Sequence, residues 1–178
     1  MSNTTPSLRT ARALLRPFAR RDAGAAHRVF GDAEVMRFAA GEPDADVDAT
    51  RRRLARYAAL QAARGFSKWG AWRLETGAYL GDAGLTVLPE TGEIELGYRL
   101  ARARWGQGLA TEIAAAWLGY ALGELGLARV IAFADPRNLA SLRVMAKIGM
   151  TFARADHLAG MDCVVYEARR EEVHRGDG

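Results

Sequence analysis

A glycine-bearing segment between a short extended run and a long apolar helix constrains the fold of this chain most strongly. It reads Arg-Trp-Gly-Gln-Gly-Leu-Ala-Thr-Glu over residues 104–112 and follows a strand that we expect to end at Leu100. The first N–H groups of a helix have no partners inside it, and glycines allow a ligand to approach the backbone closely. The segment therefore predicts a phosphate site at the start of the helix, with a tight turn that requires glycine as the alternative.

Two other phosphate-binding patterns fit this segment poorly. A P-loop requires Gly-Lys-Ser or Gly-Lys-Thr, and the segment has neither. A dinucleotide-binding fold requires a small residue where Thr111 stands and an acidic residue about 20 positions onward. Here the next expected strand is followed by Asp135, further along the chain, and the strands before the segment form a meander. We exclude the first pattern and disfavour the second.

Hydrophobic periodicity predicts the remaining elements. Leu109, Ile113 and Trp117 give the helix expected over 109–125 one apolar face. The expected strands are 13–17, 69–75, 79–88, 93–100, 129–134, 151–156 and 163–169, and the other expected helices are 22–30, 48–64 and 139–148. Turn residues at 76–77 and 89–92 separate three of the strands, which is typical of an antiparallel meander. The predicted fold class is α+β, a mixed, mostly antiparallel sheet with helices on both faces.

Length and composition favour one folded unit. The chain has 178 residues, of which 49% are hydrophobic and 26% charged, as in ordinary globular proteins. That length suits one domain. We therefore expect a single domain over 1–178 with its core over 13–169, and frayed ends at 1–12 and 171–178.

Composition also bears on compartment and partners. One cysteine, Cys163, excludes an intramolecular disulfide and a cysteine-cluster metal site, and its apolar neighbours favour burial over a nucleophilic role. The longest apolar stretch, 113–122, is too short to span a membrane, and the N-terminal segment lacks the apolar core of a signal peptide. The basic residues are mostly arginines dispersed along the chain, which disfavours a nucleic-acid partner. We expect a cytoplasmic protein that binds no metal, membrane or nucleic acid.

Three motifs occur in one order and together resemble one family. They are Glu-Leu-Gly-Tyr-Arg-Leu at 95–100, Trp-Gly-Gln-Gly-Leu-Ala-Thr-Glu at 105–112, and Asn-x-x-Ser-x-Arg-Val-Met-x-Lys-x-Gly-Met at 138–150. The set resembles the GNAT superfamily of acyl-CoA N-acetyltransferases over residues 14–166. The tryptophan at Trp105 is common in the Rim-type branch, whose named members acetylate the N-termini of ribosomal proteins.

The resemblance implies that acetyl-CoA binds in an opening between the fourth and fifth expected strands, 93–100 and 129–134. The glycine loop and helix start would hold the pyrophosphate. The pantetheine arm would pair with the main chain of Tyr98 to Leu100 and with the side chain of Asn138. Capping of the helix expected over 139–148 is the alternative role for Asn138. The residues implied in cofactor binding are Tyr98, Arg99, Leu100, Trp105, Gly106, Gln107, Gly108, Leu109, Ala110, Thr111, Asn138 and Arg143.

Direct transfer to an amine requires a group that accepts the amine's proton and one that stabilises the leaving thiolate. Glu95 matches the family's glutamate position, and Glu93 lies two residues earlier on the same strand; ion pairing or a solvated position is the alternative for both. Many members use a tyrosine as the acid where this chain has Met145. The candidate donor is therefore Ser141, one turn earlier, with support of the helix cap as its alternative role.

The sequence leaves the acceptor and the assembly open. The resemblance implies a primary amine, either a ribosomal-protein N-terminus or a small molecule. An exposed strand edge or the helix over 109–125 could support a homodimer. Because Met145 replaces the usual tyrosine, a non-catalytic acyl-CoA-binding or regulatory protein of the same fold is the second hypothesis.

Overall fold

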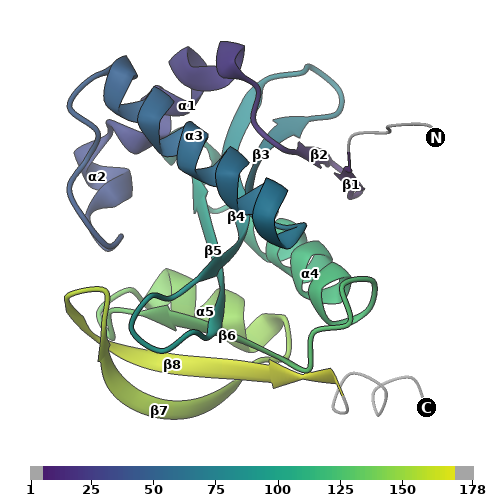
Figure 1. Ribbon diagram of the computed structural model, residues 1–178, viewed down its shortest axis with the longest axis vertical. Coiled ribbons are helices and arrows are strands. Elements are labelled where there is room, and N and C mark those ends of the chain that lie inside the picture. Colours follow the sequence, from purple (N-terminus) through teal and green to yellow (C-terminus); the bar gives the residue numbers. More distant parts are fainter. Residues whose placement is uncertain (1–5, 171–178) are drawn as a thin grey trace.

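The computed structural model describes residues 6–170 and contains one eight-stranded sheet (Figure 1). Its strands lie side by side in the order β1-β2-β3-β4-β5-β6-β8-β7. The strands are β1 (Leu8–Arg9), β2 (Ala13–Arg16), β3 (Lys68–Arg73), β4 (Tyr79–Val87), β5 (Ile94–Leu100), β6 (Arg129–Ala134), β7 (Thr151–Leu158) and β8 (Met161–Arg169). Within the described residues β5 and β6 run parallel, and every other neighbouring pair is antiparallel. The predicted mixed, mostly antiparallel sheet is confirmed.

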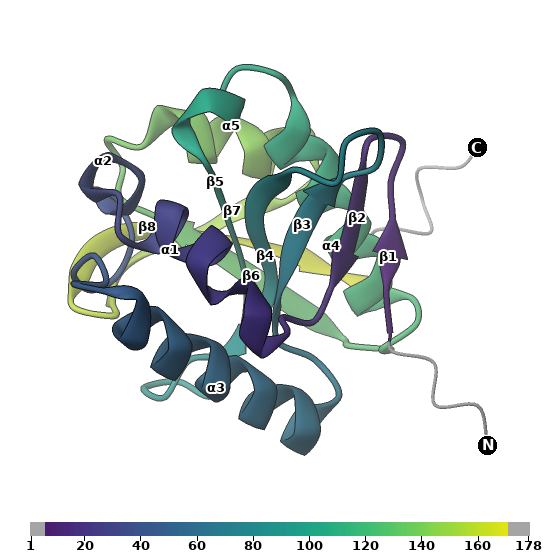
Figure 2. The same ribbon diagram turned by 90° about the horizontal axis from the view of Figure 1, so that it is seen from above.

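Helices cover both faces of this sheet. They are α1 (Ala23–Phe30), α2 (Ala33–Met36), α3 (Val47–Arg64), α4 (Leu109–Leu122) and α5 (Leu139–Lys147), with single 3-10 turns at Arg20–Asp22 and Arg102–Arg104. Seen from above, α1 and α3 lie on one side of the sheet and α4 lies on the other (Figure 2). Trp117 of α4 packs edge-on against Trp69 of β3, with ring centroids 4.5 Å apart. Among residues 6–170, no helix combines the length and apolarity that crossing a membrane requires.

The side chains of β5 alternate between the two faces, as in any strand. Leu96 and Leu100 are buried in the core cluster that contains the apolar face of α4. Glu95 and Arg99 therefore point to the opposite face, which α1 and α3 cover. The side chains of residues that are adjacent in the β5 motif thus lie on opposite faces of the sheet.

The strands β5 and β6 separate soon after they meet. Their register consists of one pair, Glu95 opposite Ile131, whereas β6 pairs with β8 along its whole length. Beyond Glu95, the edge of β5 that faces β6 therefore has no strand partner. This divergence lies where the resemblance implied an opening between the fourth and fifth expected strands.

Two short elements were not predicted. Strand β1 has two residues and helix α2 has four, too few for either period to be recognised in a sequence. After β1, the hydroxyl of Thr10 and the Nε of Arg12 each donate to the carboxylate of Glu112 over 2.6 Å, so the ordered chain begins before Ala13. The fraying expected at 171–178 lies outside the described residues, as do residues 1–5.

Candidate active site

A cavity of about 710 Å³ lies where β5 and β6 diverge. Its walls come from these two strands, the start of α4, the first turns of α5 and the chain around α2. Glu95 and Ser141 line it, and Glu93 does not. Every residue that the sequence analysis implicated in cofactor binding also lines it, namely Tyr98, Arg99, Leu100, Trp105, Gly106, Gln107, Gly108, Leu109, Ala110, Thr111, Asn138 and Arg143.

The glycine loop presents the start of α4 to this cavity. Gly106 and Gly108 have φ of 72° and 73°, a left-handed conformation that favours glycine, and no side chain caps the helix at Gly108. From the far side, Arg12 donates to the carbonyl oxygen of Gln107 over 2.9 Å and pairs with Glu112 over 2.6 Å. The loop is held in place from outside the cavity, so the N–H groups of the first turn are available to an anion.

The edge of β5 supplies main-chain groups to the same cavity. The N–H of Ala101 donates to Leu80 of β4 over 2.9 Å. Because the direction of main-chain groups alternates along a strand, those of Leu96 and Tyr98 point away from β4 toward the gap. The carbonyl oxygen of Leu100 is already occupied, since the indole of Trp105 donates to it over 2.9 Å. The free stretch that could pair with an extended arm is therefore centred on Tyr98.

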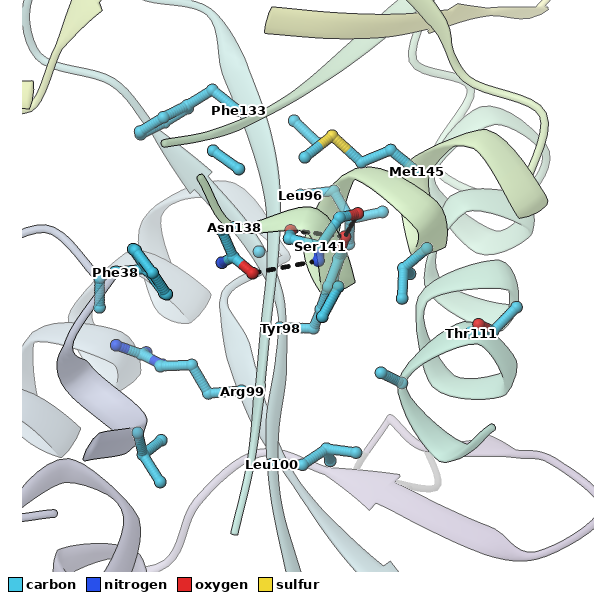
Figure 3. A pocket seen from close by; sticks show the side chains of 18 of the residues that line it. Phe38, Leu96, Tyr98, Arg99, Leu100, Thr111, Phe133, Asn138, Ser141 and Met145 are labelled. Atoms are coloured by element: carbon cyan, nitrogen blue, oxygen red, sulfur yellow. Dashed lines mark hydrogen bonds between the residues drawn. The ribbon is translucent and has the colours of Figure 1, made fainter. Parts of the chain in front are cut away.

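The start of α5 brings Asn138, Ser141 and Tyr98 together (Figure 3). The Oδ1 of Asn138 accepts from the N–H of Ser141 over 3.2 Å, so Asn138 caps the helix and keeps its amide nitrogen for a ligand. The phenol oxygen of Tyr98 lies 3.1 Å from both the Oγ and the carbonyl oxygen of Ser141. Burial, reinforced by the charge of Glu95, raises the pKa of Tyr98 to about 12, so the phenol stays protonated at neutral pH.

Met145 lies one turn after Ser141 and is 1% exposed. Its thioether donates no proton, and Figure 3 shows it in the cavity wall beyond Ser141. Hydroxyl groups at this end of the cavity come from Ser141 and Tyr98. Tyr98 was expected to contribute its main chain alone, because the contact of its phenol with Ser141 depends on the packing of α5 over β5.

Glu95 lies on the other face of β5, in a polar cluster that the sequence did not predict. Lys68 of β3 reaches Glu95 Oε2 with its ammonium at 3.2 Å, and the hydroxyl of Thr86 on β4 donates to the same oxygen over 2.7 Å. All three residues line the cavity. The second carboxylate oxygen, Oε1, accepts no hydrogen bond from the described residues, so it is free to accept one from a ligand.

Glu93 is separated from Glu95 by its ion pairs. Arg129 and Arg154 bind its two carboxylate oxygens over 2.6 and 2.8 Å. The hydrogen bond from Arg154, supported by that from Arg129 and opposed by partial burial, lowers the pKa of Glu93 to about 2. So weak a base outside the cavity is a poor proton acceptor, and the geometry favours Glu95.

Replacing Glu93 by glutamine is expected to lower stability in a pH-dependent way. The folded pKa of about 2 lies below the ordinary value of 4.5, so the stabilisation is complete above about pH 4.5 and is lost as the pH falls toward 2. Solvent screening limits the expected loss at pH 7 to about 1 kcal/mol. Urea unfolding of both proteins at pH 7 and pH 3 measures it; equal differences at the two pH values would contradict the assignment.

Apart from Lys68, the basic side chains that line the cavity fall into two groups. Arg99, a predicted cofactor residue, pairs with Asp82 over 2.8 Å and donates to Tyr57 over 3.0 Å, and Figure 3 shows its side chain extending away from Ser141. Its guanidinium is thus engaged in the fold, leaving the main chain for a ligand. The second group lines the cavity and makes no ion pair among the described residues: Arg104, Arg143 and Lys147. Cations without partners favour a phosphate-bearing ligand.

The described residues contain no group of histidine, cysteine and carboxylate side chains arranged to hold a metal ion. The site therefore consists of an uncapped helix start, an unpaired strand edge, a hydroxyl pair on one face of β5 and a carboxylate on the other. This arrangement suits a ligand with phosphates at one end and an extended amide-bearing arm that crosses the sheet edge.

Comparisons with known proteins agree with this description. The family model described as an acetyltransferase (GNAT) domain matches residues 12–151. YkkB, an uncharacterized protein of Bacillus subtilis, is 34% identical over 145 residues, which cover 79% of this chain and 82% of that protein.

Solved structures share the whole fold. An acetyltransferase from Agrobacterium tumefaciens superposes with a TM-score of 0.80 at 27% identity, covering 95% of this chain and 97% of that one. RimL, described as a ribosomal alpha-N-protein acetyltransferase in complex with coenzyme A, superposes with a TM-score of 0.78 at 17% identity and covers 92% and 98% of the two chains. Similarity at that identity shows the fold alone.

Proposed function

The chain belongs to the GNAT acetyltransferase family, and from that premise we propose that it transfers an acetyl group from acetyl-CoA directly to a primary amine. The observation that carries the proposal is the placement of Glu95 and Ser141 on opposite faces of β5, at the point where it leaves β6. A thioester held along this edge would have a proton acceptor on one side and a hydrogen-bond donor on the other.

Different residues of the chain act at different atoms of the reactants. Acetyl-CoA supplies the thioester, whose C–S bond breaks as the new N–C bond forms. Glu95 Oε1 takes the proton that the amine loses, directly or through water. A main-chain N–H of β5 near Tyr98 stabilises the developing oxyanion, and the hydroxyl of Ser141 stabilises the leaving thiolate, which takes up a proton to give free CoA.

Direct transfer is favoured over an acetylated enzyme. Cys163, the single cysteine, is 3% exposed and lies outside the cavity lining. Burial raises the pKa of the Cys163 thiol, which disfavours the reactive thiolate. The proposal therefore places both substrates in the site at once.

The acceptor in this proposal is a protein N-terminus or a small amine. The Rim-type branch, suggested by Trp105, implies a ribosomal-protein N-terminus, and the likeness to RimL extends to the fold. We propose a cytoplasmic location with acetyl-CoA and the amine as partners. A homodimer through an exposed strand edge belongs to the same proposal.

Two measurements test the proposed function. Calorimetry with acetyl-CoA measures binding, and release of the free thiol measures transfer across amines that include peptides beginning with alanine or serine. Binding together with acceptor-dependent thiol release supports the transferase. Binding without thiol release for every amine would instead favour the non-catalytic acyl-CoA-binding protein, to which the buried Met145 lends weight.

Replacing Ser141 by alanine is expected to lower the rate of the chemical step by about tenfold, since a hydrogen bond to a charged group is lost. Tyr98→Phe removes the phenol that contacts the Ser141 hydroxyl and should give a smaller decrease. Single-turnover measurements at saturating acetyl-CoA isolate this step. An unchanged rate in Ser141→Ala would leave Ser141 as part of the helix cap only.

A further inference from the structure

Lys68 is a buried cation that the proposed chemistry does not use. The chain has 25 lysines and arginines, and its lysines are Lys68 and Lys147 alone. The side chain of Lys68 is 8% exposed, yet it lines the cavity beside Glu95. A buried ammonium carries a large desolvation cost, so the groups around it indicate what it is there to meet.

One glycine, Gly97, makes room for the end of this side chain. In the sheet register Lys68 of β3 lies opposite Gly84 of β4, and Gly84 lies opposite Gly97 of β5. The side chain of Lys68 reaches Glu95 of β5 with its ammonium, whereas a Cβ atom at Gly84 would meet the backbone of Ser67 and Lys68. A Cβ atom at Gly97 would collide with the Lys68 ammonium nitrogen and with Oε1 of Glu95. The absence of a side chain at Gly97 therefore leaves space at the point where the two charges meet.

Some hydrogen-bonding groups of Lys68 and Glu95 have no partner among the described residues. An ammonium has three donors, and within residues 6–170 one acceptor lies in reach of Lys68, namely Oε2 of Glu95. Thr86 donates to the same oxygen, so Oε1 of Glu95 is left without a donor. The cavity is thus lined by an ammonium with unused donors, Lys68, next to a carboxylate oxygen with an unused lone pair, Oε1 of Glu95.

The other charges on this face are already matched. Arg99 is neutralised by Asp82, and on the α2 side the exposed Glu34 lies 3.8 Å from Arg37. Arg104, Arg143 and Lys147 lie toward the α4 and α5 side, where the phosphates are proposed to bind. On the face of β5 that would receive the acceptor, Lys68 pairs with one oxygen of Glu95 and is accordingly the cation with donors left for an anionic group.

We propose that Lys68 receives a carboxylate of the acceptor, so that the preferred substrate is an amino acid whose carboxylate is attached to the carbon bearing the reacting amine. This inference rests on the proposed function. The amine lies at Glu95 Oε1 and the carboxylate at the spare donors of Lys68, so the two substrate charges meet two opposite charges that are adjacent in the site. A polyamine would instead bring a second ammonium toward Lys68 and be repelled.

Binding to the complex of the protein with CoA tests this, using ligands matched in all but the carboxylate. Calorimetry compares glycine, leucine and phenylalanine with their carboxamides and with the amines obtained by decarboxylation. At least one amino acid should bind about tenfold or more tightly than its decarboxylated amine. In Lys68→Met this ratio should fall to about one, because no charged donor remains.

Two further variants separate this effect from a loss of fold. Gly97→Ala displaces the Lys68 ammonium and the Glu95 carboxylate oxygen together, without removing either, and should also abolish the ratio. Arg28→Met removes an exposed cation of α1 away from the cavity and should leave the ratio unchanged. Thermal melting verifies that each variant is folded.

Three results would overturn the inference: equal or tighter binding of every decarboxylated amine to the wild type, an unchanged ratio in Lys68→Met, or no binding of any amino acid. Thiol release with the same ligands reports separately on the proposed function. Binding at the expected ratio without thiol release would contradict the proposed transferase activity and would still support the carboxylate site at Lys68.

Discussion

Glu95→Gln is expected to reduce kcat by about 100-fold to 1,000-fold, the range over which a positioned general base contributes to a proton-transfer step. Glutamine keeps the size of the side chain and its hydrogen bond with Thr86 but cannot hold a proton. Binding of acetyl-CoA should change little, because the phosphates are proposed to bind at the start of α4. Steady-state kinetics together with calorimetry separate these two effects.

Two further variants serve as controls for the Glu95→Gln result. Glu93→Gln lies two residues away on the same chain segment, outside the cavity, and is expected to keep turnover within about twofold because Glu93 is held by Arg129 and Arg154. The double variant Glu95→Gln with Lys68→Met removes the ammonium that the single change leaves unpaired. Stability should recover in it while turnover stays low. Full turnover in a folded Glu95→Gln protein would mean that Glu95 is not the base.

Ala110→Glu is expected to weaken acetyl-CoA binding by about 100-fold or more, since it places a negative charge where the pyrophosphate is proposed to lie. Ala110 is the second residue of α4 and lines the cavity. An acidic residue in the first turn complements the helix dipole, so the helix should tolerate the change. Calorimetry with CoA measures the affinity, and thermal melting reports on the fold.

Ala110→Gln is the matched control for this prediction, because it adds nearly the same volume without the charge. We expect it to weaken binding by about tenfold or less, through crowding alone. The difference between the two variants should shrink with rising salt as the charge is screened. Equal losses in both variants at every salt concentration would show that the start of α4 is not where the phosphates bind.

Local sequence carried enough information to predict the elements around the cavity. The helix after Gly108 and the helix after Asn138 each have a start signal and an apolar period, and both lie within a few residues of their predicted bounds. The divergence of β5 from β6 came from the resemblance rather than from any residue pattern. The capping role of Asn138 followed from its position before a helix, whatever it also does for a ligand.

The polar contacts of the site could not be read from sequence because they join distant segments. Lys68 and Glu95 are brought together by the register of three strands and by the missing side chain at Gly97. The phenol of Tyr98 meets Ser141 only because α5 packs against β5. In the same way, Glu93 looked equivalent to Glu95 by spacing, until the approach of Arg154 from β7 gave it a different role.

A crystal structure of the complex with CoA tests the central claim most directly, namely that the main-chain N–H groups of residues 106–111 hold the pyrophosphate. We predict diphosphate oxygens within hydrogen-bond distance of these groups and the arm of the ligand lying along β5 at Tyr98. A complex in which the protein's own side chains occupy those N–H groups, with the ligand bound elsewhere, would contradict the account.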